Sequence, residues 1–308
     1  MNSKKINIGV IGSGHLGQYH VKHYKTMNNI NFLGLHDSNP ERGNEIAKKY
    51  ETKYFKNVFN LMEACDGVSI VTPTESHYDV AKIALNEFGC NVFIEKPITE
   101  TISQADELIN HAQKNNLIIQ VGHIERLNPA LKALEKYDIN PKFIDIQRLA
   151  PYTVRGTDVP VVLDLMIHDI DILLSLVKSK VKSIHASGVS ILTNSVDIAH
   201  ARIRFENGTV SSVTANRVAK DKVRKIKIFQ DSLYSTIDLL LEQTEIYNIT
   251  KDSNLIKNAL QAESFPGDNE KKYIVYEKPK IKNYDSLREE LNNFVNSILN
   301  IESPIVDG

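Results

Sequence analysis

The stretch from residue 6 to residue 37 constrains the fold more than any other part of the chain. An apolar run over 6–12, INIGVIG, is followed by a segment of helical character over 13–27 and by a second apolar run over 30–37. The turn between the first run and the helix reads GSGHLG, which has the G-x-G-x-x-G spacing. Between a strand and a helix, this spacing predicts a βαβ unit that binds a dinucleotide. A glycine-rich turn without a ligand is the alternative.

The three glycines of this turn have separate roles in such a site. Gly12 would make the tight turn, Gly14 would let the backbone approach a pyrophosphate, and Gly17 would let the helix pack closely on the strand. The N–H groups at the start of the helix, around His15 and Leu16, would then bind the phosphates. The turn therefore predicts where the cofactor phosphates lie.

The next acidic and basic residues indicate which dinucleotide is bound. Asp37 closes the second apolar run twenty residues after Gly17, where a carboxylate can accept hydrogen bonds from an adenosine ribose. The same carboxylate would repel a 2′-phosphate, so NAD is predicted as the cofactor. Arg42 nearby keeps NADP as the less favoured alternative.

The alternation of strands and helices continues to residue 123. Further strands are expected over 52–55, 67–73, 92–94 and 117–123, with helices over 40–49, 76–87 and 103–115. This pattern predicts an α/β fold for residues 1–123, a Rossmann domain with a doubly wound parallel sheet. Such sheets bind ligands at the carboxyl ends of their strands, where Thr72, Pro73 and Lys96 stand.

Residues 124–308 are expected to form a second, α+β domain on a large, mostly antiparallel sheet. Segments between 182 and 239 alternate apolar and polar residues, which is typical of strands with one buried face. Asn207-Gly208 predicts a two-residue hairpin turn, and the polar stretch 250–271 predicts a loop. The other face of so long a sheet is expected to pack against another subunit, in a homodimer or homotetramer.

A long apolar helix expected over 160–177 carries a narrow polar stripe. Asp164, His168, Asp171 and Ser175 recur at spacings that place them on one line of the helix. Apolar residues flank this line, which favours a helix buried nearly all round with a thin polar seam. A partly solvated amphipathic helix is one alternative. A metal site using Asp-x-x-x-His is another, but no second ligand pair is evident, and no metal is predicted.

Composition narrows the class of partner. With 308 residues, 42% hydrophobic residues and a net charge of -1, the chain suits two globular domains and has no field that would draw it to nucleic acid or to an anionic membrane. No apolar run approaches the roughly 20 residues that cross a bilayer, and no signal segment precedes the first strand. The cytoplasm and small-molecule partners are therefore expected. Cys65 and Cys90 are too few for a disulfide framework.

Together these motifs resemble the glucose-fructose oxidoreductase and inositol dehydrogenase family (Gfo/Idh/MocA). The resemblance covers nearly the whole chain, in order, and rests on the glycine turn with Asp37, Thr72-Pro73 with His77, Glu95-Lys96-Pro97, and Asp164-x-x-x-His168. It implies a nicotinamide-dependent dehydrogenase that acts on a secondary hydroxyl of a sugar or cyclitol, with the active site between the two domains. It also implies that the bond before Pro97 is often cis.

The resemblance further implies roles for single residues. Lys96 and His168 would face the nicotinamide and the substrate, Asp164 would stand beside them, and His77 and Glu95 would belong to the cofactor site. Removal of a hydride from a carbinol carbon is easier when the hydroxyl proton also leaves, so a base is needed within reach of that oxygen. Either Lys96 or His168 could take the proton, and the sequence leaves this open.

Two segments, VGHIERLNPA (121–130) and RGTDVPVVLDLMIHDIDI (155–172), are similar to one branch of the family. This branch oxidises the 3-hydroxyl of UDP-N-acetylglucosamine on the way to the 2,3-diamino sugars of lipid A. Arg126, Asn128 and Arg155 stand at the matching positions and would bind the anionic substrate, because a guanidinium pairs with phosphate in a bidentate fork. A structural ion pair is the alternative for each arginine.

Two other functions remain open at this point. One is an inositol or free-sugar dehydrogenase, which needs no contacts to a diphosphate. The other is a non-catalytic NAD(P)-sensing regulator, which has no need for the proton-transfer pair of Lys96 and His168. The basic run KDKVRKIK (220–227) is predicted to be one solvated face of a strand rather than a diphosphate site.

Overall fold

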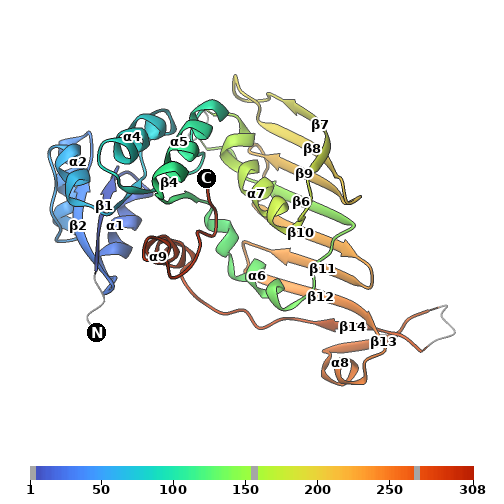
Figure 1. Ribbon diagram of the computed structural model, residues 1–308. Helices are drawn as coiled ribbons and strands as arrows, with labels where there is room; N and C mark the ends of the chain where they lie inside the picture. Colours follow the sequence, from blue (N-terminus) through green and yellow to red (C-terminus); the bar gives the residue numbers. More distant parts are fainter. Residues whose placement is uncertain (1–4, 154–158, 267–270) are drawn as a thin grey trace. The chain divides into compact units, whose positions relative to one another are not determined.

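The computed structural model describes residues 5–153, 159–266 and 271–308, and the chain divides into two compact units (Figure 1). One comprises the residues up to Ile124 together with Asp285–Gly308, and the other comprises Glu125–Tyr284. The predicted division into 1–123 and 124–308 placed the C-terminal segment in the second domain. In the structure this segment belongs to the first unit.

The first unit is built on a parallel sheet with the strand order β2-β1-β3-β4-β5. Its strands are β1 (Ile6–Ile11), β2 (Ile30–His36), β3 (Gly67–Ile70), β4 (Asn91–Glu95) and β5 (Ile119–Gly122). The almost complete burial of β1, β3 and β4 explains their continuous apolar runs. The strand order reverses at β1, so its carboxyl end is the switch point where doubly wound sheets bind ligands. The predicted Rossmann fold is confirmed.

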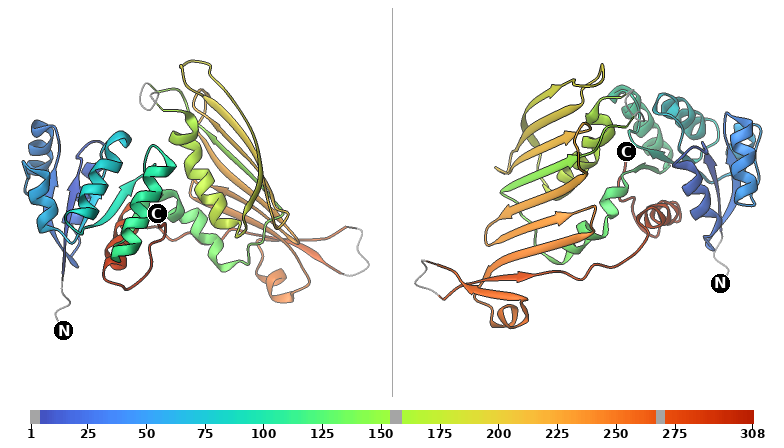
Figure 2. Two further views of the ribbon diagram at one scale, coloured as in Figure 1. Left: turned by 45° about the horizontal axis from the view of Figure 1, so that its top comes forward. Right: turned by 180° about the vertical axis from the view of Figure 1, so that it is seen from behind.

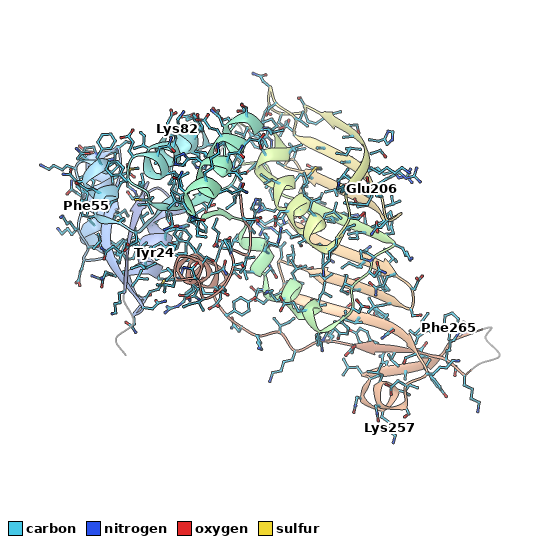
Figure 3. The ribbon with its side chains drawn as sticks, in the orientation of Figure 1. Tyr24, Phe55, Lys82, Glu206, Lys257 and Phe265 are labelled. Carbon is cyan, nitrogen blue, oxygen red and sulfur yellow. The ribbon has the colours of Figure 1, made fainter. Side chains whose placement is uncertain are left out.

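Helices cover both faces of this sheet. One hydrophobic core joins it to α1 (Gly17–Lys25), α2 (Pro40–Lys49) and α9 (Ser286–Ile298), and Tyr24 is fully buried there (Figure 3). A second core joins it to α3 (Val58–Ala64), α4 (Thr74–Asn86) and α5 (Ile102–Asn115). The sheet is therefore protected from water on both sides, as its apolar strands require.

The C-terminal helix α9 was not predicted from the sequence. Asp285 caps its first turn by accepting a hydrogen bond from the backbone N–H of Arg288 at 3.0 Å. Leu291, Phe294 and Val295 are fully buried in the core that α9 shares with α1. The helix thus completes the face of the sheet that also carries the helix of the glycine turn.

The second unit is a nine-stranded sheet with the order β13-β14-β12-β11-β10-β6-β9-β8-β7. Its strands are β6 (Phe143–Leu149), β7 (Val181–Val189), β8 (Ile198–Phe205), β9 (Val210–Asn216), β10 (Val223–Gln230), β11 (Leu233–Asp238), β12 (Gln243–Thr250), β13 (Gln261–Ser264) and β14 (Tyr273–Glu277). The central pair β6–β9 is parallel, and the other pairs in this order are antiparallel. The mostly antiparallel sheet is confirmed.

The helical segments that pack on this sheet lie on one of its faces (Figure 2). Those that share the hydrophobic core of the sheet are α6 (Pro129–Lys132), η2 (Ala133–Lys136), the π-helix η3 (Val162–Met166) and α7 (Ile167–Leu176). The short helix η1 (Ile124–Leu127) precedes α6 in the chain. Alternate residues of β8 are buried beneath the helical segments, while His200, Arg202 and Arg204 point to the other face and are exposed. The predicted alternation is confirmed for β8. For the edge strand β7 it is wrong, because both faces of that strand are exposed along almost its whole length.

Several local predictions in this unit were wrong. The connection between β8 and β9 spans residues 206–209, and of its residues Gly208 has a positive φ of +89° whereas Asn207 does not. A two-residue type I′ turn needs positive φ at both central positions, so the hairpin forms with a longer loop. The predicted loop over 250–271 contains α8 (Ser253–Asn258) and the edge strand β13.

Candidate functional site

The glycine turn after β1 has the geometry of a phosphate-binding turn. Gly12 has a φ of +94°, and a Cβ atom there would lie 2.5 Å from the carbonyl oxygen of Val71. A Cβ atom on Gly17 would lie 2.9 Å from the carbonyl carbon of Gly12 and closer still to its oxygen. At Gly14, by contrast, no described atom lies within 4 Å of the Cβ position. The backbone at Gly14 is therefore open to a ligand, and the neighbouring His15 and Leu16 are exposed.

Asp37, directly after β2, binds the glycine turn itself. Its Oδ2 accepts hydrogen bonds from the backbone N–H and the hydroxyl of Ser13, both at 2.7 Å, and its Oδ1 accepts one from the backbone N–H of Asn39 at 2.8 Å. Arg42 on α2 donates to the carbonyl of Ser13 at 3.2 Å and to Glu45 at 2.9 Å. The fully buried Ser13 was missed by the sequence analysis, because no motif position marks it. Asp37 thus shapes the turn and places a negative charge beside it.

His77 joins the loops that follow β3 and β4. Its ring nitrogens lie 2.8 Å from the carbonyl oxygen of Pro97 and 2.9 Å from that of Thr72. The ring is buried in the first turn of α4, which begins after Pro73. The hydroxyl of Thr72 is buried and has no hydrogen-bond partner among the residues that the structure describes. His77 therefore holds the two strand-ending loops against each other.

Lys96 follows β4 directly and is half-buried, and the Lys96–Pro97 bond is cis, as the family resemblance implied. The carboxylate of Glu95 lies 3.2 Å from Nε2 of His20, a completely buried residue of α1. A Cβ atom on Gly122 would lie 2.9 Å from this carboxylate, so Glu95 is enclosed between α1 and β5. Glu95 therefore anchors the backbone that carries Lys96.

The carboxyl ends of β1, β2 and β3 fit a nicotinamide dinucleotide. The open backbone at Gly14 suits a pyrophosphate, and the carboxylate of Asp37 stands beside the same turn for a ribose. The buried hydroxyl of Thr72, which lacks a partner within the described part of the chain, provides a polar group for a ligand at the end of β3. The predicted cofactor residues of these three strand ends therefore lie on one edge of the sheet.

In the second unit, Asp164 and His168 lie where the π-helical turn η3 passes into α7, and both are half-buried. Single π-helical turns are uncommon and occur frequently at functional sites. Leu163 and Leu174, 40% and 48% exposed, belong to the same helical segment. The prediction of a helix buried nearly all round is therefore wrong, because α7 buries the side that faces the sheet and leaves apolar residues exposed on the other.

The residues predicted to bind an anionic substrate have partners within this unit. Arg126 donates from Nε and Nη2 to the two carboxylate oxygens of Asp171, at 2.7 and 2.8 Å. Asn128 caps α6 and donates to Glu125 at 3.2 Å. Arg126 thus forms a structural ion pair, the alternative to substrate binding that the sequence left open. Contacts of Arg126 and Asn128 with the substrate stay predictions. Arg155 lies outside the described residues.

A buried ion cluster beside α7 was not predicted. Arg148 of β6 is 2% exposed and donates from Nε and Nη2 to Asp169 at distances from 2.8 to 3.0 Å. Its Nη1 donates to Glu125 at 3.0 Å, and Arg224 of β10 donates to the same oxygen at 2.9 Å. Arg224 belongs to the basic run predicted as a solvated strand face. That prediction is wrong for Arg224, which turns to the helix-covered face.

The charge states of this cluster follow from burial and attraction. Burial alone would lower the pKa of Arg148, but the charges of Asp169 and Glu125 outweigh it and raise the pKa above its ordinary value. Burial also raises the pKa of the Asp169 carboxyl, against the attraction of Arg148. The short bidentate contact favours the ionised pair. An acid on the apolar side of an amphipathic helix needs a buried partner, and this signal could have revealed Asp169 in the sequence.

The described residues meet neither the requirements of a metal site nor those of a membrane-spanning helix. Within residues 5–153, 159–266 and 271–308, no three or more His, Cys, Asp or Glu side chains are grouped so that they could hold a metal ion. None of the helices in these ranges is long and apolar enough to cross a membrane. Cys65 and Cys90 are free thiols, and burial raises the pKa of Cys90 to about 11.

The Rossmann unit with its phosphate-binding turn, joined to an open-sheet unit with Asp164 and His168 on a helix, defines an NAD-binding oxidoreductase. Residues 6–123 match the model of an oxidoreductase family with an NAD-binding Rossmann fold, and residues 150–231 match the C-terminal domain of the same family. The chain belongs to the Gfo/Idh/MocA oxidoreductase family.

Individual proteins that are similar to this chain support the same family assignment. The UDP-N-acetylglucosamine 3-dehydrogenase of Acidithiobacillus ferrooxidans is 34% identical over 301 residues, which cover 97% of this chain and 91% of that protein. A solved structure of that enzyme matches with a TM-score of 0.87 and 32% identity, over 99% of this chain and 92% of the other. The myo-inositol 2-dehydrogenase of Thermotoga maritima is 24% identical, over 98% of this chain and 91% of its own length.

Proposed function

We propose that this protein oxidises the 3-hydroxyl of UDP-N-acetylglucosamine to a ketone and passes the hydride to NAD. The observation that carries the proposal is the similarity to the Acidithiobacillus ferrooxidans enzyme, 34% identical over nearly the whole length of both chains. The cofactor edge of the sheet supports it, since Asp37 is bonded to the glycine turn and disfavours a 2′-phosphate. When bound, NAD supplies the hydride acceptor.

Lys96 and His168 are the proposed proton-handling residues. Lys96 is carried by a loop that His77 and Glu95 hold in place, so its ammonium group can hydrogen-bond a substrate oxygen and stabilise alkoxide charge as that develops. The imidazole of His168 can take the hydroxyl proton near neutral pH, and Asp164, one turn earlier, can stabilise the imidazolium. A non-catalytic sensor would not need this pair of residues.

Substrate turnover separates this proposal from its alternatives. The purified protein is incubated with NAD and UDP-N-acetylglucosamine, myo-inositol or free N-acetylglucosamine, and the absorbance of the reduced cofactor is followed. Reduction with the UDP-sugar alone supports the proposal. Reduction with myo-inositol or the free sugar favours the other dehydrogenase, and no reduction with any of them, while NAD still binds, favours a sensor.

The cellular role follows from this reaction. A 3-keto UDP-sugar is a substrate for amination, so we propose that the enzyme acts in the cytoplasm at the start of the route to the 2,3-diamino sugars of lipid A. Arg126, Asn128 and Arg155 are the proposed contacts to the anionic part of the substrate. For Arg126 this requires one guanidinium to serve both Asp171 and a phosphate.

We also propose a homodimer or homotetramer formed through the uncovered face of the large sheet. Five aromatic residues stand in register there on neighbouring strands, with ring centroids of successive pairs 4.8 to 5.9 Å apart: Phe143, Phe229, Tyr234, Tyr247 and Tyr276. Phe143 and Phe229 are 38% and 40% exposed. A row of partly exposed rings on one face of the sheet supports contact with a second copy.

A further inference from the structure

The cluster of Arg148, Asp169 and Glu125 has no part in the chemistry proposed above, yet it contains the most deeply buried charges beside the proposed base. Arg148 and Asp169 are 2% and 1% exposed, and His168 is the neighbour of Asp169 in α7. Arg148 donates hydrogen bonds to two carboxylates, that of Asp169 on α7 and that of Glu125 on η1. One guanidinium thus joins β6, α7 and η1.

Such a pair is an unusual way to stabilise a helix on a sheet. Transfer of two charges from water to a protein interior costs several kcal/mol per ion, and apolar residues of similar size often serve stability as well or better. The other residues of α7 that face the sheet, Ile172 and Leu173, are apolar and fully buried. Hydrophobic packing therefore already holds α7 on the sheet. The ion pair adds an orientation of the helix about its axis rather than stability.

This orientation of α7 determines where the side chain of His168 points. Successive residues of an α-helix project about 100° apart, so an Asp169 fixed on Arg148 also fixes the side from which His168 leaves the helix. On the N-terminal side, the π-helical turn replaces the regular α-helical bonds, and the backbone N–H of Ile167 donates to the carbonyl of Val162 five residues earlier. The regular 3.6-residue spacing therefore does not continue through this turn, and contacts outside the helix are needed to fix where His168 points. On the C-terminal side, Arg126 grips Asp171 with two further bonds. His168 thus lies between the π-helical turn and two carboxylates held by arginines.

We propose that Arg148 and Asp169, with Glu125 holding the second side of the guanidinium, are positioning residues that set the rotation of α7 and thereby the orientation of His168. This inference rests on the proposed function in that His168 is taken as the base. Arg148 and Asp169 touch neither substrate nor cofactor in this proposal. Their replacement should change what His168 does without preventing the protein from folding.

The test replaces both charges at once. Arg148→Met with Asp169→Leu removes the pair without leaving a lone buried charge, while Glu125 keeps Arg224 as a partner. We expect a melting temperature close to that of the wild type, unchanged NAD affinity, and a kcat lowered by up to about 100-fold, the loss that a displacement of about 1 Å can cause. Ile172→Val, a buried change on the same helix, is the matched control and should leave kcat within about twofold.

A readout independent of turnover is the NMR signal of the His168 ring, assigned by its loss in His168→Gln. We expect its chemical shift and pH titration midpoint to differ from wild type in the double variant and to be unchanged in Ile172→Val. An unchanged His168 signal together with an unchanged kcat would overturn the inference. If the double variant does not fold, Arg148→Lys replaces it, and a wild-type His168 signal there has the same meaning. Absence of turnover in the wild type would count against the proposed function and leave the NMR test standing.

Discussion

Two alanine substitutions in the glycine turn, three residues apart, are predicted to have different effects: one lowers the stability of the protein and the other lowers its affinity for NAD. At Gly17, a Cβ atom would lie 2.9 Å from the carbonyl carbon of Gly12 and nearer to the oxygen, both of them backbone atoms that cannot turn away. At Gly14, no described atom lies within 4 Å of the Cβ position. Gly17→Ala should therefore destabilise the protein itself, and Gly14→Ala should affect only what binds to it.

The expected magnitudes differ accordingly. Overpacking of this kind costs about 1–3 kcal/mol, or more when backbone must move. Each kcal/mol lowers the melting temperature by about 2–4 °C in a unit of roughly 150–250 residues, and by less if the whole chain unfolds together. Gly14→Ala should leave the melting temperature without NAD within about 1 °C of wild type. Its methyl group would occupy the space of the pyrophosphate, and we expect NAD affinity to fall about tenfold or more, which is about 1.4 kcal/mol.

The assay is thermal unfolding with and without NAD, together with titration calorimetry, since the chain has no tryptophan to report binding by its fluorescence. Wild type should gain about 2.7 kcal/mol of stability at an NAD concentration a hundred times its dissociation constant. With a tenfold weaker affinity, Gly14→Ala should lose about half of this gain at the same NAD concentration, and more if the affinity falls further. Full NAD affinity in Gly14→Ala would refute the assignment of the turn as the pyrophosphate site, and an unchanged melting temperature in Gly17→Ala would refute the packing argument.

Three further predictions concern other parts of the molecule. Lys96→Ala and His168→Ala should each abolish turnover while NAD affinity measured by calorimetry stays nearly intact; loss of NAD affinity alone would contradict their roles. Burial lowers the pKa of His23 in spite of the nearby Asp285, so the unfolded chain binds more protons at acid pH. Stability should fall as the pH drops below about 6.5, and His23→Asn should reduce that fall in acid-dependent unfolding curves. Phe229→Asp should shift the assembly toward monomer in sedimentation velocity, whereas a wild-type profile would exclude the aromatic face as the interface.

The parts of the fold that the sequence predicted are those fixed by short-range rules. The glycine spacing between an apolar strand and a helix requires one backbone path, and Gly12 has the positive φ that this path needs. The alternation in β8 shows directly which of its residues face the core. Asp37 was found because it ends the second strand of a βαβ unit, although its bonds to Ser13 depend on side-chain geometry that no spacing reveals.

The parts that the sequence did not predict depend on contacts between distant segments. Arg148 and Asp169 are separated by a strand-to-helix connection, and no motif gives either of them a role, so their pairing required the fold. The segment of α9 has an amphipathic pattern, but nothing in it shows that the helix packs with α1. The π-helical turn at Asp164 was missed because an apolar helix with a polar stripe has the same pattern with or without one wide turn.

Transfer of a labelled hydride tests the central claim most directly. UDP-N-acetylglucosamine carrying deuterium at carbon 3 is incubated with the protein and NAD, and both products are examined by mass spectrometry. The account predicts deuterium in the reduced nicotinamide ring and a sugar nucleotide that has lost the label and become a 3-ketone. Deuterium retained in an unchanged sugar nucleotide, under conditions where calorimetry shows NAD bound, would contradict it.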